Sequence, residues 1–112
     1  MAVSWKQLAS GVAIGTASTM VVTAPSQTQV QFDAASVYNS AGSAVNVQLY
    51  LLPSGGSPST AALITSKNVP SLGSLFLADV VNHKLEPGGI LYAIAGATGC
   101  TVNVSGKWYV PQ

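Results

Sequence analysis

The sequence predicts an all-β fold, an antiparallel β-sandwich of jelly-roll-like form with about eight short strands. Apolar and polar residues alternate with the two-residue period of a half-buried strand, most clearly over residues 45–52. Groups of Gly, Pro, Ser and Asn recur roughly every 8 to 12 residues, which is the spacing of turns in a sandwich or a jelly roll. No window shows the roughly 3.6-residue apolar period of an amphipathic helix.

The N-terminal part has the weakest strand patterns, which predict strands at 5–15 and 18–24. Because chain termini are often ordered only by docking, residues 1–14 are expected to form an N-terminal arm or an edge strand, and residues 15–112 the β-sandwich domain. Gly and Thr residues interrupt the apolar stretch 5–24, and no window approaches the ~18 apolar residues of a membrane span. We therefore expect neither a secretory signal nor a membrane partner.

The segment 29–39, QVQFDAASVYN, predicts a strand with one irregularity. Phe32 and Val37 are both apolar but fall on opposite parities, so a regular strand would turn one of them away from the core. The pattern therefore predicts a β-bulge near Ala34 and Ala35.

The turn-forming stretch NSAGS at 39–43 separates the strand at 29–39 from the clear strand at 45–52. This short link predicts that the two strands pair as a hairpin. Weaker strands are predicted at 61–69 and 74–81.

The C-terminal part predicts a turn and two more strands. In the LEPGG stretch, Pro87 fixes one dihedral angle, and Gly88 or Gly89 can supply a positive φ. A strand is predicted at 89–96 and a terminal strand at 101–110. The expected apolar side of the terminal strand carries Val102, Val104, Trp108 and Val110.

The surface must be covered mainly by neutral residues, because only 6% of the sequence is charged, where roughly 25% is typical of soluble proteins. Hydrophobic residues make up 48%, which is enough for the core of one domain of 112 residues. Ser, Thr, Asn and Gln are left to cover the surface, and a neutral surface resists contact with other chains less than a charged one. The composition favours a protein that works in contact with other chains.

The charged residues and the single cysteine exclude several classes of function. The net charge is +1, Arg is absent, and Lys6, Lys67, Lys84 and Lys107 are scattered, so nucleic acid is not an expected partner. Cys100 is the only cysteine, which excludes an internal disulfide and a cysteine-based zinc site.

No catalytic or cofactor-binding motif occurs. His83 is the only histidine and the three acids have no ligand spacing, so no metal site is expected. Asp79, His83 and Cys100 could supply an acid, a base and a nucleophile, but no family signature surrounds Cys100. The chain also lacks a phosphate-binding loop and a dinucleotide fingerprint. We therefore expect no cofactor and no enzymatic activity, and we interpret the uncharged loop 53–60 as a turn whose tip can contact a partner.

The aromatic residues provide a candidate partner interface. Core packing or a subunit contact explains them better than a platform for sugars or bases, because aromatic side chains dominate both kinds of burial. The candidate interface residues are Trp5, Leu8, Tyr50, Trp108 and Tyr109.

Two stretches of the chain follow one another in a suggestive order. SVYNSAGSAVNVQLYLLPSGG at 36–56 precedes LEPGGILYAIAGATGCTVNVSG at 85–106. This order resembles a class of small β-sandwich virion proteins of tailed bacteriophages, in which N-s-G-x-x-V-x-V-x-L-Y-L-v-P-s-G-G is followed by L-x-P-G-x-x-L-x-A and a closing V-N-V-x-V-S-G strand. The similarity covers about residues 15–106, and its motifs are structural. The NHK stretch before LEPGG and the tail KWYVPQ depart from the pattern.

The resemblance implies a capsid decoration protein, also called a cement protein, that bridges capsid subunits and stabilises the head. Its expected partners are the major capsid protein and other copies of the chain in a homotrimer. It would lie on the outer capsid surface of the virion after synthesis in the host cytoplasm. Related sandwiches occur in tail tips, fibres and spikes, so a module for host attachment is the alternative. A carbohydrate-binding sandwich is a third hypothesis, which requires an exposed aromatic cleft.

Overall fold

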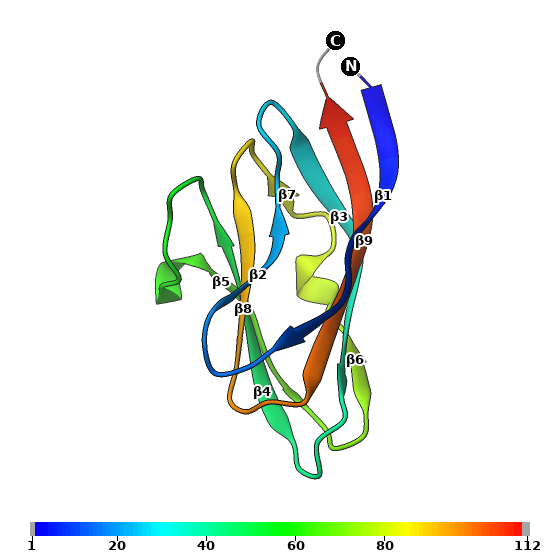
Figure 1. The fold of residues 1–112 in the computed structure, drawn as a ribbon, viewed down its shortest axis with the longest axis vertical. Helices are drawn as coiled ribbons and strands as arrows, with labels where there is room; N and C mark the ends of the chain where they lie inside the picture. The colour runs from blue at the N-terminus through cyan, green and yellow to red at the C-terminus, as the bar shows by residue number, and fades with distance from the viewer. Residues whose placement is uncertain (1, 111–112) are drawn as a thin grey trace.

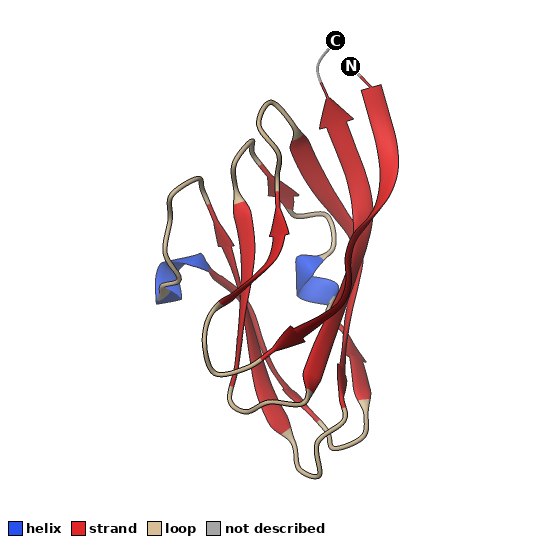
Figure 2. Ribbon diagram, viewed as in Figure 1, coloured by secondary structure: helices blue, strands red, loops and turns tan. Residues whose placement is uncertain are grey.

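A computed structural model of the chain describes residues 2–110 and shows two β-sheets packed face to face (Figures 1 and 2). Met1, Pro111 and Gln112, which complete the expected ranges 1–14 and 15–112 and the KWYVPQ tail, lie outside the described residues. The strands of the described part are β1 (Ala2–Ile14), β2 (Thr19–Thr23), β3 (Gln29–Asn39), β4 (Val45–Leu52), β5 (Leu63–Val69), β6 (Ser74–Phe76), β7 (Lys84–Leu85), β8 (Ile90–Ala95) and β9 (Cys100–Val110). Two short 3-10 turns are η1 (Thr60–Ala62) and η2 (Ala78–Val80). Neither turn has the length and hydropathy that a membrane-crossing helix needs.

The strand order is that of a jelly roll. The first sheet has the order β1-β9-β3-β6, with β7 also paired to β3, and the second has the order β2-β8-β4-β5. Because β6 and β7 both pair with β3, they act as one interrupted strand. The chain is then one long antiparallel hairpin that pairs β1 with β9, β2 with β8, β3 with β6 and β7, and β4 with β5. Wound into two layers, it forms the predicted eight-stranded sandwich.

The core lies between the two sheets because the inward positions of the strands are apolar. Val30 and Phe32 of β3, Val47 and Leu49 of β4, and Val102 of β9 are completely buried. Removing one such side chain from water stabilises the fold by roughly 1.5–3 kcal/mol. The period-two alternation in the sequence therefore does select the inner face of each sheet.

The β-bulge predicted near Ala34 and Ala35 is confirmed. The register of β3 against β9 shifts between Phe32 and Ala34, which leaves Asp33 without an opposing residue. As a result Phe32 and Val37 both point into the core, with exposed fractions of 0% and 1%.

The predicted LEPGG turn also forms. Gly88 adopts the positive φ of 80°, and the Gly89 N–H donates a hydrogen bond of 2.8 Å to the carbonyl of Glu86. Pro at the second position and a left-handed Gly at the third are the signature of a type II turn.

The predicted hairpin between 29–39 and 45–52 is wrong. β3 belongs to the first sheet and β4 to the second, so the link 40–44 crosses from one layer to the other. Five extended residues reach roughly 16 Å, which is more than the ~10 Å between packed sheets. A link of this length can therefore turn within a sheet or cross between sheets.

Only the first part of the predicted strand 74–81 is extended. β6 ends at Phe76, and the turn η2 follows. Leu77 and Val80 are both completely buried and lie three residues apart, a spacing that a helical turn brings to one side and a strand does not. The strand β7 was not predicted, because its two residues are too few to show a period.

The strand β1 lies at the edge of the first sheet. It pairs with β9 from Ala2 to Ile14, with register shifts between Gln7 and Ala9 and between Ala9 and Val12. No strand among the described residues pairs with its second edge. The segment expected to be an arm or an edge strand thus adds a long strand to the sheet.

Candidate functional site

The residues that could form an acid, base and nucleophile are far apart. Cys100 pairs with Asn39 at one end of β3, whereas the backbone of His83 is hydrogen-bonded to Phe32. Asn39 lies seven residues along the strand from Phe32, or about 23 Å at ~3.3 Å per residue. Burial also raises the pKa of the Cys100 thiol. This arrangement holds no nucleophile and base in contact.

Asp79 has structural partners instead. Its Oδ2 accepts a hydrogen bond of 3.0 Å from the Thr65 hydroxyl and lies 3.6 Å from Lys67 Nζ, so it links η2 to β5. Within residues 2–110, no three His, Cys, Asp or Glu side chains gather in a group that could hold a metal ion.

Three of the five candidate interface residues lie on or beside β1. Trp5 is 75% exposed, and Lys107 Nζ lies 4.4 Å from the centroid of its ring. Leu8 falls at a register shift of β1 and packs partly against the core. Trp108 of β9 also packs partly against the core, with Lys6 Nζ 4.7 Å from its ring. Of these three, Trp5 is the one that is free to contact a partner.

The two tyrosines of the candidate interface are held within the chain. Tyr50 is only 9% exposed, and its hydroxyl donates a hydrogen bond of 2.8 Å to Gln48. The Tyr109 hydroxyl donates a 2.9 Å hydrogen bond to Oε1 of Gln31. The structure therefore does not bring the five candidate residues into one patch.

The outer face of the first sheet carries most of the large apolar side chains that are exposed. Strand register places Val3 opposite Tyr109, Trp5 opposite Lys107, and Phe76 and Tyr38 on the same side, away from the core. Their exposed fractions are 50% for Val3, 75% for Trp5, 61% for Phe76 and 44% for Tyr38. In the described chain only Met20 and Leu72 are comparable and lie elsewhere. Large apolar side chains exposed together on one face make it a candidate contact surface.

A hollow of about 280 Å³ opens in the middle of this outer face. It forms because the outward side chains of the two central strands are short here, at Ala34 and Ser36 of β3 and at Ser105 of β9. Phe76 of β6 borders the hollow on one side, and Gln7 of β1 borders it on the other. Its lining consists of Gln7, Ala9, Ala34, Ala35, Ser36, Phe76, Asn103, Val104 and Ser105.

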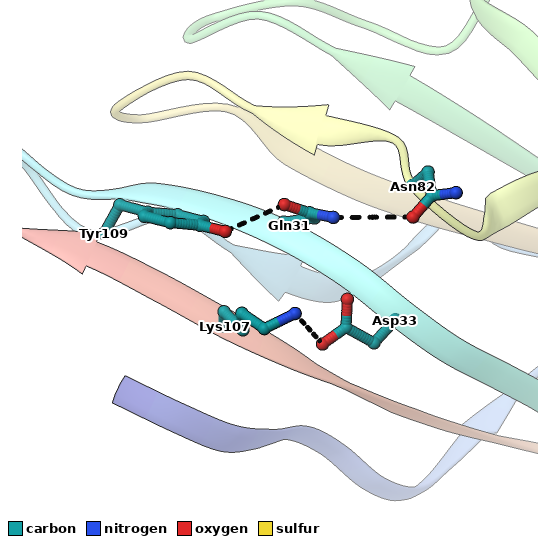
Figure 3. A network of polar contacts seen from close by, with 5 residues as sticks. All are labelled: Gln31, Asp33, Asn82, Lys107 and Tyr109. Atoms are coloured by element: carbon teal, nitrogen blue, oxygen red, sulfur yellow. Dashed lines mark hydrogen bonds and ion pairs between the residues drawn. The ribbon is translucent and has the colours of Figure 1, made fainter. Parts of the chain in front are cut away.

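Two charged residues of the outer face, Lys107 and Asp33, pair with each other (Figure 3). Lys107 Nζ lies 2.9 Å from Oδ2 of Asp33, the bulged residue of β3, and this oxygen is shielded from solvent. Beside this pair, Gln31 accepts from Tyr109 and donates a long 3.4 Å hydrogen bond to Asn82. The centre of the face is consequently close to neutral.

A second surface lies at one end of the sandwich, where three loops contain no charged residue. The loops 40–44, 70–73 and 96–99 follow β3, β5 and β8 and meet at the lower end of the view in Figure 1. We call this surface the loop end.

Hydrogen bonds hold the loops of the loop end together. The backbone N–H and the hydroxyl of Ser40 both donate to the carbonyl of Gly99, each at 2.9 Å. The Ser71 hydroxyl donates to the carbonyl of Ala41 at 2.8 Å. Because the loops bond to one another, the loop end presents a defined neutral surface.

Leu72 at the loop end combines exposure with an unfavourable backbone conformation. It is 68% exposed and has a φ of 54°, which costs a side chain with a Cβ about 1–2 kcal/mol. Two other turns also start with Pro-Ser and have a left-handed third residue, and the fourth residue in all three donates to the Pro carbonyl. The third residues of the three turns are Gln27, Gly55 and Leu72. A strained, exposed leucine where glycine would fit is a sign of a contact function.

Sequence reasoning missed several of these residues. Tyr38 could have been found, because the bulge that places Val37 in the core turns its neighbour outward. Phe76 lies in the predicted strand 74–81 and Leu72 lies between two predicted strands, and no local pattern there separates exposed from buried leucine or phenylalanine.

The comparisons with known proteins add little. No model of a protein family and no curated protein matches the chain. Among solved structures, the chain is similar to the VP2 subviral particle of infectious bursal disease virus, with 12% identity and a TM-score of 0.44. The match covers 97% of this chain, which spans about a third (32%) of that protein. At this level the similarity says nothing about what the chain does.

Proposed function

We propose that the chain is a structural protein of a virion, a decoration protein that bridges capsid subunits on the outside of the head. The observation that carries this proposal is the loop end, a charge-free surface with the exposed Leu72 held in a left-handed conformation. The jelly-roll strand order supports it by analogy, since such domains are frequent in viral capsids. The motif order in the sequence supports the same class.

The stabilising mechanism follows from repeated weak contacts. An oligomer presents several copies of one weak site to neighbouring capsid subunits, and each attachment after the first is intramolecular, which raises avidity by ~10²–10⁴. A neutral contact is also screened little by salt. Bridges between neighbouring subunits would then raise the cost of separating them under internal pressure.

The alternative, a tail-tip, fibre or spike module, uses the same fold for host attachment. It predicts binding to cells or glycans and no binding to heads. The outer face of the first sheet has exposed aromatic side chains beside a hollow, which is the arrangement that the carbohydrate-binding hypothesis requires. Glycan binding is therefore a measurement that separates the two functions.

The test is co-sedimentation of the purified chain with heads that lack it, at low and at high salt. We expect binding that changes little with salt and that weakens in Leu72→Gly. The matched control is Gln27→Gly, which relieves the same left-handed conformation in a turn outside the loop end and should bind normally. Binding to host cells but not to heads would replace the proposal by its alternative, and equal binding of both variants would remove the role of Leu72.

A further inference from the structure

We propose that a second copy of the chain covers the outer face of the first sheet, with Trp5 of each copy seated over the hollow of the other. This inference goes beyond the proposed function, because it concerns how copies associate and does not depend on where they bind. It rests on the apolar side chains, the hollow and the neutral centre of one continuous face.

The area of the face matches what a stable dimer needs. Four strands at ~4.8 Å give a width of about 19 Å, and the strand β9 at ~3.3 Å per residue gives a length of about 36 Å. The product is roughly 700 Å² per copy, or about 1,400 Å² in total, and specific interfaces bury about 1,200–2,000 Å². A second copy can therefore cover the whole face without any further surface.

Trp5 and the hollow are complementary in size and chemistry. A cavity of about 150 Å³ accepts a benzene ring, so the hollow of about 280 Å³ has room for an indole ring. Trp5 is 75% exposed, and aromatic anchors of this kind dominate interface energies when they fill a pocket. The floor of the hollow, at Ala34 and Ser36, offers no charge that would have to be desolvated.

The charges of the face do not oppose the contact. Lys107 is neutralised by Asp33 at 2.9 Å, and the other lysine of the face, Lys84, stands on the short strand β7 at the opposite edge from β1. Glu86 accepts a hydrogen bond of 3.0 Å from Gln29 near the border of the face. The exposed apolar side chains therefore lie towards the two ends of the face, with paired or neutral polar side chains between them.

The position of Trp5 and the hollow on one face determines the symmetry. If Trp5 of the first copy lies over the hollow of the second, and Trp5 of the second lies over the hollow of the first, the same operation must exchange the two copies. That operation is a two-fold axis, a rotation of 180°. A three-fold ring would need the two surfaces to point in different directions. The geometry thus favours a dimer, where the resemblance noted in the sequence implies a trimer.

The first test is the mass of the full-length chain in solution by light scattering or sedimentation. We expect 22.6 kDa, twice the 11.3 kDa of one chain. Trp5→Ala should raise the dissociation constant of the dimer at least about 30-fold, while its circular dichroism stays unchanged and its thermal unfolding matches that of the wild type when both are measured at a concentration at which they are monomeric. The control is Met20→Ala, which removes a similarly exposed side chain from the second sheet and should leave the dimer intact. A chain that is still monomeric near ~1 mM, a trimer, or a dimer unaffected by Trp5→Ala overturns the proposal.

A cross-linking test locates the axis. Gln7 lies on β1 between Trp5 and the hollow. In the two-fold contact, residue 7 of one copy therefore lies close to residue 7 of the other copy. Gln7→Cys should form a disulfide-linked dimer under mild oxidation, whereas Met20→Cys should not. The native Cys100 is 1% exposed and does not interfere. Equal cross-linking of both variants, or none with Gln7→Cys, contradicts the two-fold contact.

Discussion

Asn39 is the residue that ties the loop end to the core, and its removal should destabilise the whole domain. Its side chain is completely buried and fully paired. Nδ2 donates to the carbonyls of Ser43 at 2.9 Å and of Val69 at 3.1 Å, and Oδ1 accepts from the N–H of Ala41 at 2.8 Å. One amide thus joins β3, the link to β4 and the end of β5.

Asn39→Ala removes three hydrogen bonds and leaves their backbone partners without replacement. At about 1 kcal/mol for each bond, the free energy of unfolding should fall by about 3 kcal/mol. For a domain of this size, about 4 °C per kcal/mol gives a melting temperature lower by about 12 °C. Chemical denaturation and calorimetry of the purified variant measure both quantities.

Two further variants separate the hydrogen bonds from the loss of bulk. Asn68→Ala removes an exposed amide whose partner is Asn46 at 3.2 Å, and it should cost less than about 0.5 kcal/mol. Asn39→Asp places a buried carboxyl beside two carbonyls, which raises its pKa above the unfolded value. The native state then binds the proton more tightly, so this variant should be most stable at low pH and lose stability as pH rises. An Asn39→Ala protein within 1 kcal/mol of wild type, at about the precision of such measurements, would refute the reasoning.

Three more predictions concern stability and reactivity. Gly106→Ala should destabilise by at least about 1–3 kcal/mol in denaturant titrations, because a Cβ there would overlap the carbonyl oxygen of Gln31; unchanged stability would mean that β3 and β9 can separate locally. Leu72→Gly should raise the free energy of unfolding by up to about 1 kcal/mol, and with it the melting temperature, because it relieves the positive φ; a decrease would show that the leucine packs against the chain. Cys100 should react with thiol reagents only as fast as the protein unfolds. Burial raises the pKa of the Cys100 thiol, so the native state keeps the thiol proton to a higher pH than the unfolded chain does. The free energy of unfolding should therefore fall as pH rises above the ordinary thiol value of about 8.5. Cys100→Ala should remove this dependence on pH.

Local patterns were sufficient for features that depend on a few neighbouring residues. The alternation in 45–52 identified the buried side of β4, and the parity change between Phe32 and Val37 identified the bulge. The LEPGG turn was predictable because proline and glycine limit the backbone directly. The prediction of one strand over 74–81 failed because the local pattern there is too short to read. Leu77 and Val80 reach the core through a turn of three residues, which cannot show a helical period.

The candidate surfaces were predictable only in part. Trp5 was named from its aromatic character and is exposed, while Tyr50 was named for the same reason and is buried. Residue type does not tell these two apart. The hollow beside Phe76 involves four strands from distant parts of the chain, so no single segment carries its pattern.

By itself, the sequence determined the class of fold, because the period of two, the spacing of turns and the scarcity of charge are properties of consecutive residues. The tertiary structure alone decided which sheet each strand joins, and so which exposed side chains share a face. The physical reason is that strand alternation encodes a side of the sheet but no partner, and a link as short as 40–44 permits either a turn or a crossing. Partner choice follows from burying both apolar faces against each other, a property of the whole chain.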